Sequence, residues 1–349
     1  MQPTMNFLSL GIAFVVTFIS ILLMRPLARK FGLVDKPGGR KTHSKDTPLI
    51  GGLGIFLGLL AGAILSPEIL TQYKVLLLIA SLLLLTGLID DFYPLPALAR
   101  LGIQVLAAWL MCTAGENQLI TLGQLFGDRE LLLGRYAMVM TIFATVGMIN
   151  AINMIDGMDG LSGGLAMICL LFLGCTAIAS GNNPALLSLS LLSASCLLAF
   201  LFLNFRAPVN KPALIYLGDS GSTMLGFILA WLLIESSQGG TEQVMPATIA
   251  LWFMAIPLMD TVFLFIARPL AGKSPFEPGT DHLHHLLALH GLSKAKVVLL
   301  LYGAGIVLGG AGFLLYSMPD LEKYSVYLFL VVFILYVLIM RFEKTTLKK

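Results

Sequence analysis

Residues 73–91 read YKVLLLIASLLLLTGLIDD, an apolar run that ends directly in two adjacent acidic residues. Lys74 is the only charged residue among the first seventeen of these positions. A helix that crosses a bilayer needs roughly 20 apolar residues, within a range of about 17–25. The stretch therefore predicts a membrane-spanning helix that carries Asp90 and Asp91 at one end.

The rest of the chain repeats this apolar pattern. Of its 349 residues, 57% are hydrophobic and only 12% are charged, whereas soluble proteins carry about 25% charged residues. A soluble core of this length has no room for so much apolar surface, but a bilayer does. We predict an all-α, polytopic membrane protein with a single domain over residues 1–349. Its apolar runs predict eleven membrane-spanning helices, at about 5–24, 49–66, 73–89, 97–114, 136–152, 161–180, 185–205, 220–236, 244–266, 295–316 and 324–340.

Lysine and arginine residues are distributed unequally between the two sides of this arrangement. Eighteen of the 22 fall in segments on one side, and only Lys74, Arg129, Arg135 and Lys323 fall on the other. Because basic residues gather in cytoplasmic loops, we expect the first side in the cytoplasm. This places the N-terminus in the periplasm and the C-terminus in the cytoplasm. The net charge of only +3 argues against nucleic acid as a partner.

Dense polar clusters lie on the predicted cytoplasmic side, which predicts one composite active site at that membrane face. A transporter of an anionic or lipid-linked solute is the alternative from another class, and it would place ionisable residues near the bilayer midplane. Glu235 and Asp260 are the only acids inside predicted spans, and neither has an obvious partner in the sequence. The loops that carry the clusters are 25–48, 90–100, 150–160, 206–222 and 267–294.

Asp90 and Asp91 form the first cluster. Two adjacent carboxylates at a membrane edge repel each other and lose hydration, and a metal or a cationic partner relieves both effects. The alternative is a solvated helix end that happens to carry two acids. A helix C-terminus disfavours negative charge, which weakens this alternative.

The second cluster is Asn150–Leu161, which reads NAINMIDGMDGL. Asn150 and Asn153 share a face if this segment is helical, and the two glycines then end the helix and let backbone approach a ligand. Asp156 and Asp159 bring carboxylates to the same turn. Amide and carboxylate oxygens are hard ligands that suit magnesium. The alternative is an ordinary Asp-Gly turn.

The third cluster is Gly218–Ser222, which reads GDSGS and opens a predicted span. Asp or Ser at a helix start is normally an N-cap, and this is the alternative for Asp219. A helix N-terminus also receives phosphate groups, and its first turn can present a metal-binding carboxylate. Tyr216, two residues earlier, offers a flat ring at the rim of such a site.

The fourth cluster, Asp281–Leu286, reads DHLHHL and lies in a loop with Arg268. Zinc is one alternative, but no cysteine or separate histidine pair completes such a site. Imidazole N–H groups beside arginine suit a diphosphate better, and a purely structural loop is the other alternative. Four of the five histidines lie within nine residues of this loop: His282, His284, His285 and His290.

The segment Lys36–Gly54 is basic and then rich in glycine and proline. It reads either as an anchor on anionic lipid or as the basic wall of a phosphate site. Together the clusters supply hard acids for a metal and basic groups for phosphate. Phosphoryl transfer needs both, because its catalysis is mostly positioning and charge neutralisation.

The clusters in this order, DD, NxxNxxDGxDGL, GDSGS and HxHH, resemble those of the polyprenyl-phosphate N-acetylhexosamine-1-phosphate transferases. The resemblance covers nearly the whole chain, from KTH…TPLIGG to HLHH. Within the family the pattern is most similar to bacterial undecaprenyl-phosphate GlcNAc-1-phosphate transferases, which initiate O-antigen and enterobacterial common antigen, lipid-linked polysaccharides of the cell envelope.

The resemblance implies a reaction at the cytoplasmic face of the bacterial inner membrane. Undecaprenyl phosphate would attack the β-phosphorus of UDP-GlcNAc, release UMP and form GlcNAc-diphospho-undecaprenol. Mg²⁺ is the implied cofactor, with Mn²⁺ as a second candidate. A sister transferase that uses another UDP-N-acetylhexosamine or UDP-MurNAc-pentapeptide is an alternative. Direct attack is favoured over an aspartyl-phosphate intermediate, and the oligomeric state, including a homodimer, is left open.

The resemblance also implies roles for twelve residues. The metal ligands would be Asp219 and Asn153. The catalytic carboxylates would be Asp90 and Asp91 at the lipid phosphate, with Asp156 and Asp159 at the nucleotide-sugar pocket. Tyr216 would stack on uracil, and Asn150 would bind substrate. The diphosphate and sugar would be held by Arg268, His282, His284 and His285.

Overall fold

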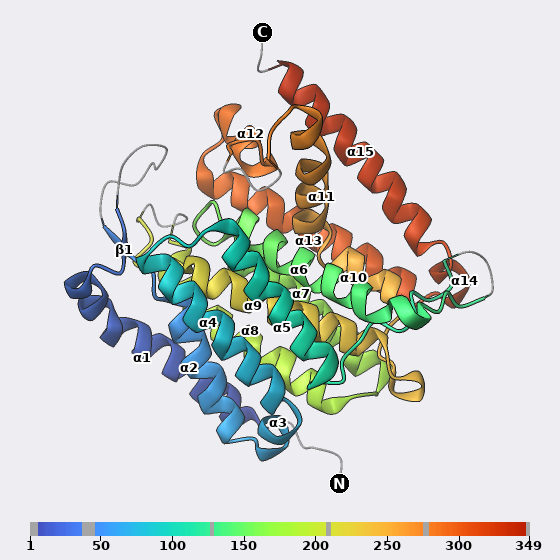
Figure 1. Ribbon diagram of the computed structural model, residues 1–349, viewed down its shortest axis with the longest axis horizontal. Helices are drawn as coiled ribbons and strands as arrows, with labels where there is room; N and C mark the ends of the chain where they lie inside the picture. The colour runs from blue at the N-terminus through green and yellow to red at the C-terminus, as the bar shows by residue number, and fades with distance from the viewer. Residues whose placement is uncertain (1–5, 37–45, 126–128, 207–210, 275–278, 347–349) are drawn as a thin grey trace.

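The computed structural model describes residues 6–36, 46–125, 129–206, 211–274 and 279–346 (Figure 1). This part of the chain is almost entirely helical, and its two short strands, β1 (Val34–Asp35) and β2 (Thr47–Pro48), pair antiparallel with Val34 opposite Pro48. The all-α class is therefore confirmed. The α-helices are α1 (Phe7–Phe31), α2 (Gly51–Ile64), α3 (Pro67–Gln72), α4 (Lys74–Phe92), α5 (Ala97–Thr113), α6 (Ala137–Ile155), α7 (Leu161–Ser180), α8 (Pro184–Asn204), α9 (Gly218–Ser237), α10 (Ala247–Phe253), α11 (Ala255–Leu270), α12 (Leu283–Leu289), α13 (Lys294–Tyr316), α14 (Pro319–Glu322) and α15 (Ser325–Thr346).

Among the described residues, eight helices are long and apolar enough to cross a membrane. A ninth span results if α10 and α11, which meet at an angle of 90°, are counted as one broken span. Each predicted span coincides with a helix or with this pair, but α2 and α5, with 14 and 17 residues, are shorter than the other candidates. The described residues thus support a multi-pass membrane protein with eight or nine clear spans, and the predicted number of eleven stays a prediction.

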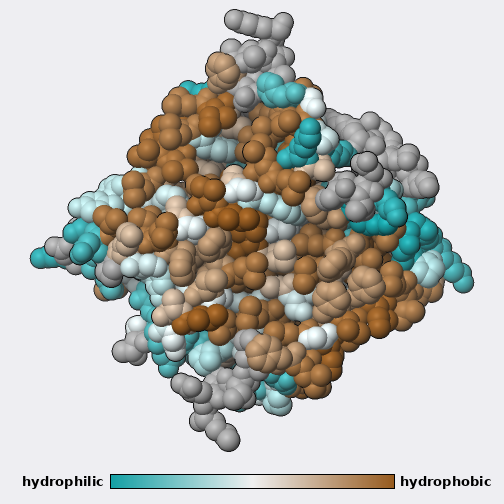
Figure 2. Space-filling model, turned by 180° about the vertical axis from the view of Figure 1, so that it is seen from behind, coloured by the Kyte–Doolittle hydropathy of each residue, from teal (hydrophilic) through white to brown (hydrophobic). Residues whose placement is uncertain are grey.

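The outer surface of the helix assembly is apolar. Figure 2 shows a broad hydrophobic face, and large side chains on the two terminal spans are exposed, including Leu23 and Phe31 on α1 and Ile334 and Ile339 on α15. A soluble monomer rarely exposes contiguous apolar patches of more than a few hundred Å². Lipid is the solvent that this surface fits.

Helix α9 lies at the centre of the assembly and packs against α2, α4, α6 and α7 (Figure 1). Two glycines allow the closest of these contacts, because a Cβ on Gly87 of α4 would lie 2.3 Å from Cα of Ser220, and a Cβ on Gly52 would lie 2.3 Å from Cα of Gly221. No side chain fits at such distances. The close approach brings the acidic end of α4 against the first turn of α9.

Candidate functional site

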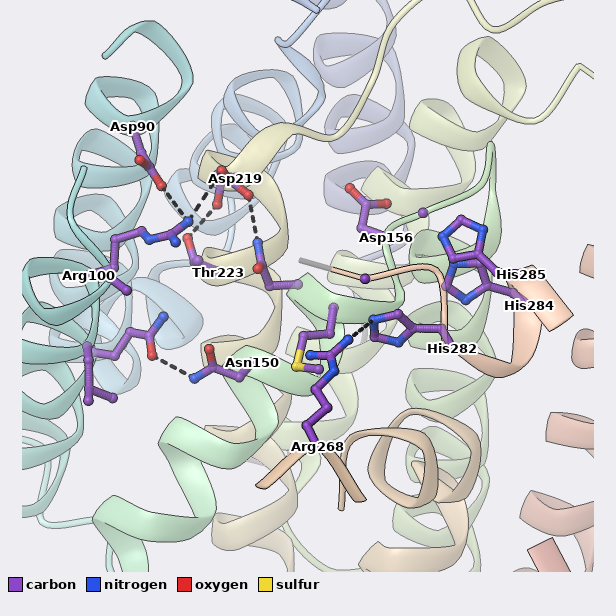
Figure 3. Close-up of a pocket in the computed structure, with 17 residues that line it drawn as sticks. Asp90, Arg100, Asn150, Asp156, Asp219, Thr223, Arg268, His282, His284 and His285 are labelled. Carbon is purple, nitrogen blue, oxygen red and sulfur yellow. Dashed lines mark hydrogen bonds and ion pairs between the residues drawn. The ribbon is translucent and has the colours of Figure 1, made fainter. Parts of the chain in front are cut away.

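A cavity of about 280 Å³ opens where five segments of the chain meet (Figure 3). The segments are the end of α4, the first turns of α5, the end of α6 with the turn after it, the start of α9, and the end of α11 together with the first turn of α12 and the residues before it. Nine of the twelve predicted site residues line it. They are Asp90, Asn150, Asn153, Asp156, Asp219, Arg268, His282, His284 and His285.

Asp91 lies behind this cavity and caps α9 from another helix. The backbone N–H of Asp219 donates to Asp91 Oδ1 at 2.8 Å, and that of Ser220 donates to Oδ2 at 3.2 Å. The first N–H groups of a helix have no partner within the helix itself, and the structure shows no side-chain cap at the N-cap residue of α9, Leu217. Asp91 supplies that cap, so the side chain of Asp219 is not the cap that the sequence left as an alternative.

The side chain of Asp219 instead faces the cavity. Asn153 Nδ2 donates to Asp219 Oδ1 at 2.7 Å and to Ser222 Oγ at 2.9 Å. The second carboxylate oxygen, Oδ2, lies 4.0 Å from Arg100, and 41% of the Asp219 side chain remains exposed. Asn150 lines the same wall and donates to Gln104 Oε1 at 2.7 Å, as expected for two asparagines on one helical face.

Asp90 forms an ion pair with Arg100, as expected for one of two adjacent carboxylates at a membrane edge. Its Oδ2 lies 3.2 Å from Arg100 Nη1, and its Oδ1 accepts the backbone N–H of Leu95 at 2.6 Å. Arg100 is 40% exposed and stands between Asp90 and Asp219 (Figure 3). The sequence analysis counted Arg100 only for topology. Its one signal was that it is the sole basic residue of loop 90–100, ten positions after Asp90.

Asp156 is held at the turn after α6, where it meets the hydroxyl of Ser162. Burial, opposed by the bond from Ser162 and assisted by the charges of Asp219 and Asp159, raises the pKa of the Asp156 carboxyl to about 7. A carboxyl with such a pKa changes its charge near neutral pH, which is a feature of groups that handle protons.

Asp159 and Tyr216 do not line the cavity within the described chain. The backbone of Tyr216 is tied to β2 and to the start of α2, because its N–H donates to Pro48 O at 2.8 Å and its C=O accepts from Gly51 at 2.9 Å. Burial and the charge of Asp159 raise the pKa of the Tyr216 hydroxyl to about 12. The two residues are therefore neighbours beside the site, and their predicted roles remain predictions.

The histidine cluster forms the opposite wall. Arg268 is 4% exposed and grips Asp281, with Nη2 2.7 Å from Oδ1 and Nε 3.2 Å from Oδ2. Its Nη2 also lies 3.4 Å from His282 Nε2. The bidentate pair fixes the arginine in one orientation, with His282 beside it.

His284 is the most deeply buried of these imidazoles, with 1% of its surface exposed. Neither of its ring nitrogens has a hydrogen-bond partner among the described residues. Burial, together with the neighbouring His285 and His282, lowers the pKa of His284 to about 3, so the ring is neutral. A buried donor and a buried acceptor without partners are costly, and a ligand in the cavity would satisfy them.

The two acids inside the spans both have partners, contrary to expectation. Glu235 accepts from Tyr73 Oη at 2.9 Å, from Asn183 Nδ2 at 3.0 Å and from Trp231 Nε1 at 3.1 Å. Asp260 contacts His282, with Oδ2 2.7 Å from Nδ1. These partners lie between 4 and 162 positions away in the sequence, and only Trp231 of them was within reach of local pattern analysis.

Comparison with known proteins identifies relatives that share most of this chain. The model of glycosyl transferase family 4 matches residues 73–237. The undecaprenyl-phosphate alpha-N-acetylglucosaminyl 1-phosphate transferase of Haemophilus influenzae is 37% identical over 332 residues, 95% of this chain and 92% of the relative. The chain belongs to the family of these undecaprenyl-phosphate sugar-1-phosphate transferases. Enzymes of the same name from Salmonella typhi and Escherichia coli (strain K12) are 36% and 34% identical over 325 residues, 93% of this chain and 88% of each relative.

The glycosyl transferase family 4 match begins beside α4 and ends with α9. It therefore spans the carboxylate wall of the cavity, while the arginine and histidine wall lies beyond it. The similarity to the Haemophilus relative covers 95% of the chain and so extends over that second wall. The family resemblance predicted from the four motifs is confirmed.

Proposed function

We propose that the chain transfers GlcNAc-1-phosphate from UDP-GlcNAc to undecaprenyl phosphate, releasing UMP. One observation carries the proposal: a single cavity holds carboxylates on one wall and arginine with three histidines on the other. A phosphoryl transfer between two anionic substrates needs this pairing of charges. The printed names of the relatives support the same donor and acceptor.

The carboxylate wall fits a magnesium ion. Mg²⁺ usually takes one or two carboxylates and completes its shell with waters and substrate phosphates, and Asp219 presents a half-exposed carboxylate beside open space. Asp219 would hold the ion, with Mn²⁺ as the second candidate and Asn153 as a further ligand through its amide oxygen. The bound ion would neutralise charge on the donor diphosphate.

Arg100 fits the phosphate of the lipid acceptor. It stands at the edge of the cavity, where a narrower cleft between α4 and α5 is lined by Leu83, Thr86 and Ile103. A prenyl chain that enters sideways from the bilayer would follow these side chains and leave its phosphate beside the guanidinium. Arginine is suited to this contact because its planar N–H groups match phosphate oxygens.

The histidine wall fits the donor. The two ring nitrogens of His284 have no partner among the described residues, so polar groups of a bound ligand could pair with them. The neutral ring offers one donor and one acceptor for such a ligand. Arg268 and His282 stand beside it for the diphosphate. UDP-GlcNAc would thus lie along this wall with its β-phosphorus toward Asp219 and Arg100.

Direct attack of the lipid phosphate is the simpler chemistry for this arrangement. An oxygen of undecaprenyl phosphate would bond to the β-phosphorus, and the bond between that phosphorus and the oxygen of the leaving UMP would break. Both oxygens of Asp91 already accept backbone N–H groups, and both oxygens of Asp90 are bonded to Leu95 and Arg100. Neither carboxylate is free to form an aspartyl phosphate without losing these bonds.

We also propose the full topology: eleven spans, with α2 and α5 as short crossings and α10 with α11 as one broken crossing. The N-terminus would be periplasmic, the C-terminus cytoplasmic, and the cavity would open to the cytoplasm at the inner membrane. The excess of basic residues in the predicted cytoplasmic segments supports this orientation.

Purified protein in lipid nanodiscs tests the function directly. Undecaprenyl phosphate, Mg²⁺ and a panel of UDP-sugars would be supplied, and UMP release measured. We expect release with UDP-GlcNAc that depends on the lipid. Release only with UDP-MurNAc-pentapeptide or another UDP-N-acetylhexosamine would assign the chain to a sister reaction, and accumulation of intact UDP-sugar in sealed vesicles would make it a transporter.

A further inference from the structure

A buried carboxylate outside the cavity controls one of the residues that line it. Asp260 on α11 is 1% exposed. Its Oδ2 lies 2.7 Å from His282 Nδ1, and its Oδ1 accepts the hydroxyl of Tyr336 at 2.7 Å and the backbone N–H of Leu283 at 3.0 Å. Of these four residues only His282 lines the cavity.

The partners determine which nitrogen of His282 carries the proton. An ionised carboxylate is only an acceptor, so the ring must donate from Nδ1 to Asp260. On the other side, Nε2 lies 3.4 Å from Arg268 Nη2 (Figure 3), and arginine is only a donor. A neutral ring with its proton on Nδ1 and its lone pair on Nε2 satisfies both neighbours.

The arrangement joins α11 and the start of α12 to α15, which is distant from both in the sequence. Tyr336 lies on α15, 76 positions after Asp260, and α11, α12 and α15 pack together at one end of the molecule (Figure 1). The hydroxyl of Tyr336 and the N–H of Leu283 hold the carboxylate from two directions. These two bonds fix the orientation of the carboxylate independently of its contact with the imidazole.

We propose that Asp260 and Tyr336 are positioning residues that hold His282 in the Nδ1–H tautomer, with Nε2 turned toward Arg268 and the cavity. The proposal deepens the proposed function, because a fixed acceptor at Nε2 keeps the Arg268 guanidinium in place for the donor diphosphate. Partners behind a functional histidine commonly fix its tautomer in this way, and their loss typically lowers activity or affinity about 10- to 100-fold.

Substituting Asp260 and Tyr336 in turn distinguishes a role in positioning His282 from a role in stability alone. Asp260→Asn keeps the size of the side chain but lets an amide N–H face the ring, which favours the opposite tautomer. We expect kcat/KM for the sugar nucleotide to fall about 10- to 100-fold. Tyr336→Phe removes one bond to the carboxylate and leaves the dyad, so a fall of about 2- to 10-fold is expected.

Glu235 provides a matched control at a distance from the cavity. It is also a largely buried acid with a tyrosine donor, Tyr73, and neither residue lines the cavity. Glu235→Gln and Tyr73→Phe should lower the melting temperature without changing kcat/KM. If the Asp260 and Tyr336 variants behaved in the same way, their role would be structural only.

Nitrogen-15 NMR of labelled histidines in lipid bilayers reads the tautomer without any assay of turnover. The His282 signals, assigned with His282→Gln, should report a proton on Nδ1 in the wild type and in Tyr336→Phe, and its loss in Asp260→Asn. A proton on Nε2 in the wild type would overturn the proposal. If Asp260→Asn does not fold, the wild-type signals and the kinetics of Tyr336→Phe still decide. Failure of UMP release with every UDP-sugar would refute the proposed function and leave the NMR result standing.

Discussion

His284 shows at the residue scale how burial prepares a side chain for a ligand. Its ring is neutral and both nitrogens lack partners among the described residues. Gly157 makes room for it, since a Cβ there would lie 2.3 Å from His284 Nε2. Sequence analysis found the cluster from the spacing of its histidines, but only the fold reveals which ring is unsatisfied.

Replacing His284 by alanine should weaken donor binding while membrane insertion stays normal. A hydrogen bond to a charged group contributes about 1.5–3 kcal/mol, so KM for the sugar nucleotide should rise about 10- to 100-fold. Steady-state kinetics would measure it, with His290→Ala, outside the cavity lining, as the control. Equal KM values for both variants and the wild type would show that His284 does not contribute to donor binding.

Asp219→Asn should make activity sensitive to magnesium. The backbone N–H of residue 219 still bonds to Asp91, so folding should be preserved. Loss of the negative charge should remove most activity at low magnesium, with partial recovery at higher concentration. UMP release across a magnesium titration, beside a melting curve, would show this. Full activity of the variant at low magnesium would contradict the metal assignment.

Ser162→Ala should change the pH dependence through Asp156. The pKa of Asp156 is raised to about 7, and the Ser162 hydroxyl lowers it. If the carboxylate is the active form, kcat/KM falls as the pH drops through about 7. Removing the hydroxyl raises the pKa further, so this fall should begin at higher pH. A pH profile of kcat/KM would reveal the shift. If the acidic side of the profile did not move in the variant, the titration of Asp156 would not control the reaction.

At the scale of elements, the contact between α4 and α9 builds the carboxylate wall. Gly87 allows it, because any side chain there would meet the backbone of Ser220. The sequence identified both helices from their apolar runs. It did not identify Asp91 as the cap of α9, because that contact joins residues 128 positions apart and no local pattern encodes it.

Gly87→Ala should separate the two helices and disturb both stability and activity. Overpacking of this kind typically costs about 1–3 kcal/mol, and the hydrogen bonds that the first turn of α9 donates to Asp91 should weaken. Gly102→Ala on α5 is the matched control, since no atom lies within 4 Å of a Cβ there. Thermal unfolding and UMP release would compare the two variants. Equal behaviour would show that this close contact does not position the site.

The broken span illustrates why some of the fold was not predictable. Residues 244–266 read as one apolar run, yet α10 and α11 meet at 90° around Met254. Hydropathy measures whether a segment prefers lipid, not whether it is straight. On the two sides of the bend, α10 packs against α13 and α9 and α11 packs against α6 and α13, contacts that hydropathy does not describe. The span predicted at 49–66 is also shorter in the structure, where α2 occupies only Gly51–Ile64, whereas α5 ends within one residue of its predicted bound.

The orientation of the molecule in the membrane is a prediction that labelling from outside the cell can test. Lys273, after α11, and Arg129 lie on opposite sides in the proposed topology, and both are exposed. With the four native cysteines replaced, Lys273→Cys should resist a membrane-impermeant thiol reagent in intact cells, while Arg129→Cys should react. Permeabilised cells provide the control, in which both should react. The reverse pattern in intact cells would invert the topology.

The fate of the β-phosphorus distinguishes transfer of GlcNAc-1-phosphate from transfer of the sugar alone. UDP-GlcNAc labelled with radioactive phosphorus at the β position would be incubated with the purified chain, undecaprenyl phosphate and Mg²⁺, and the lipid and aqueous phases would be counted. Transfer of GlcNAc-1-phosphate predicts that the label moves into the lipid and that unlabelled UMP appears in water. Label that stays in water as UDP while GlcNAc enters the lipid would show sugar transfer without phosphate and would refute the proposed reaction.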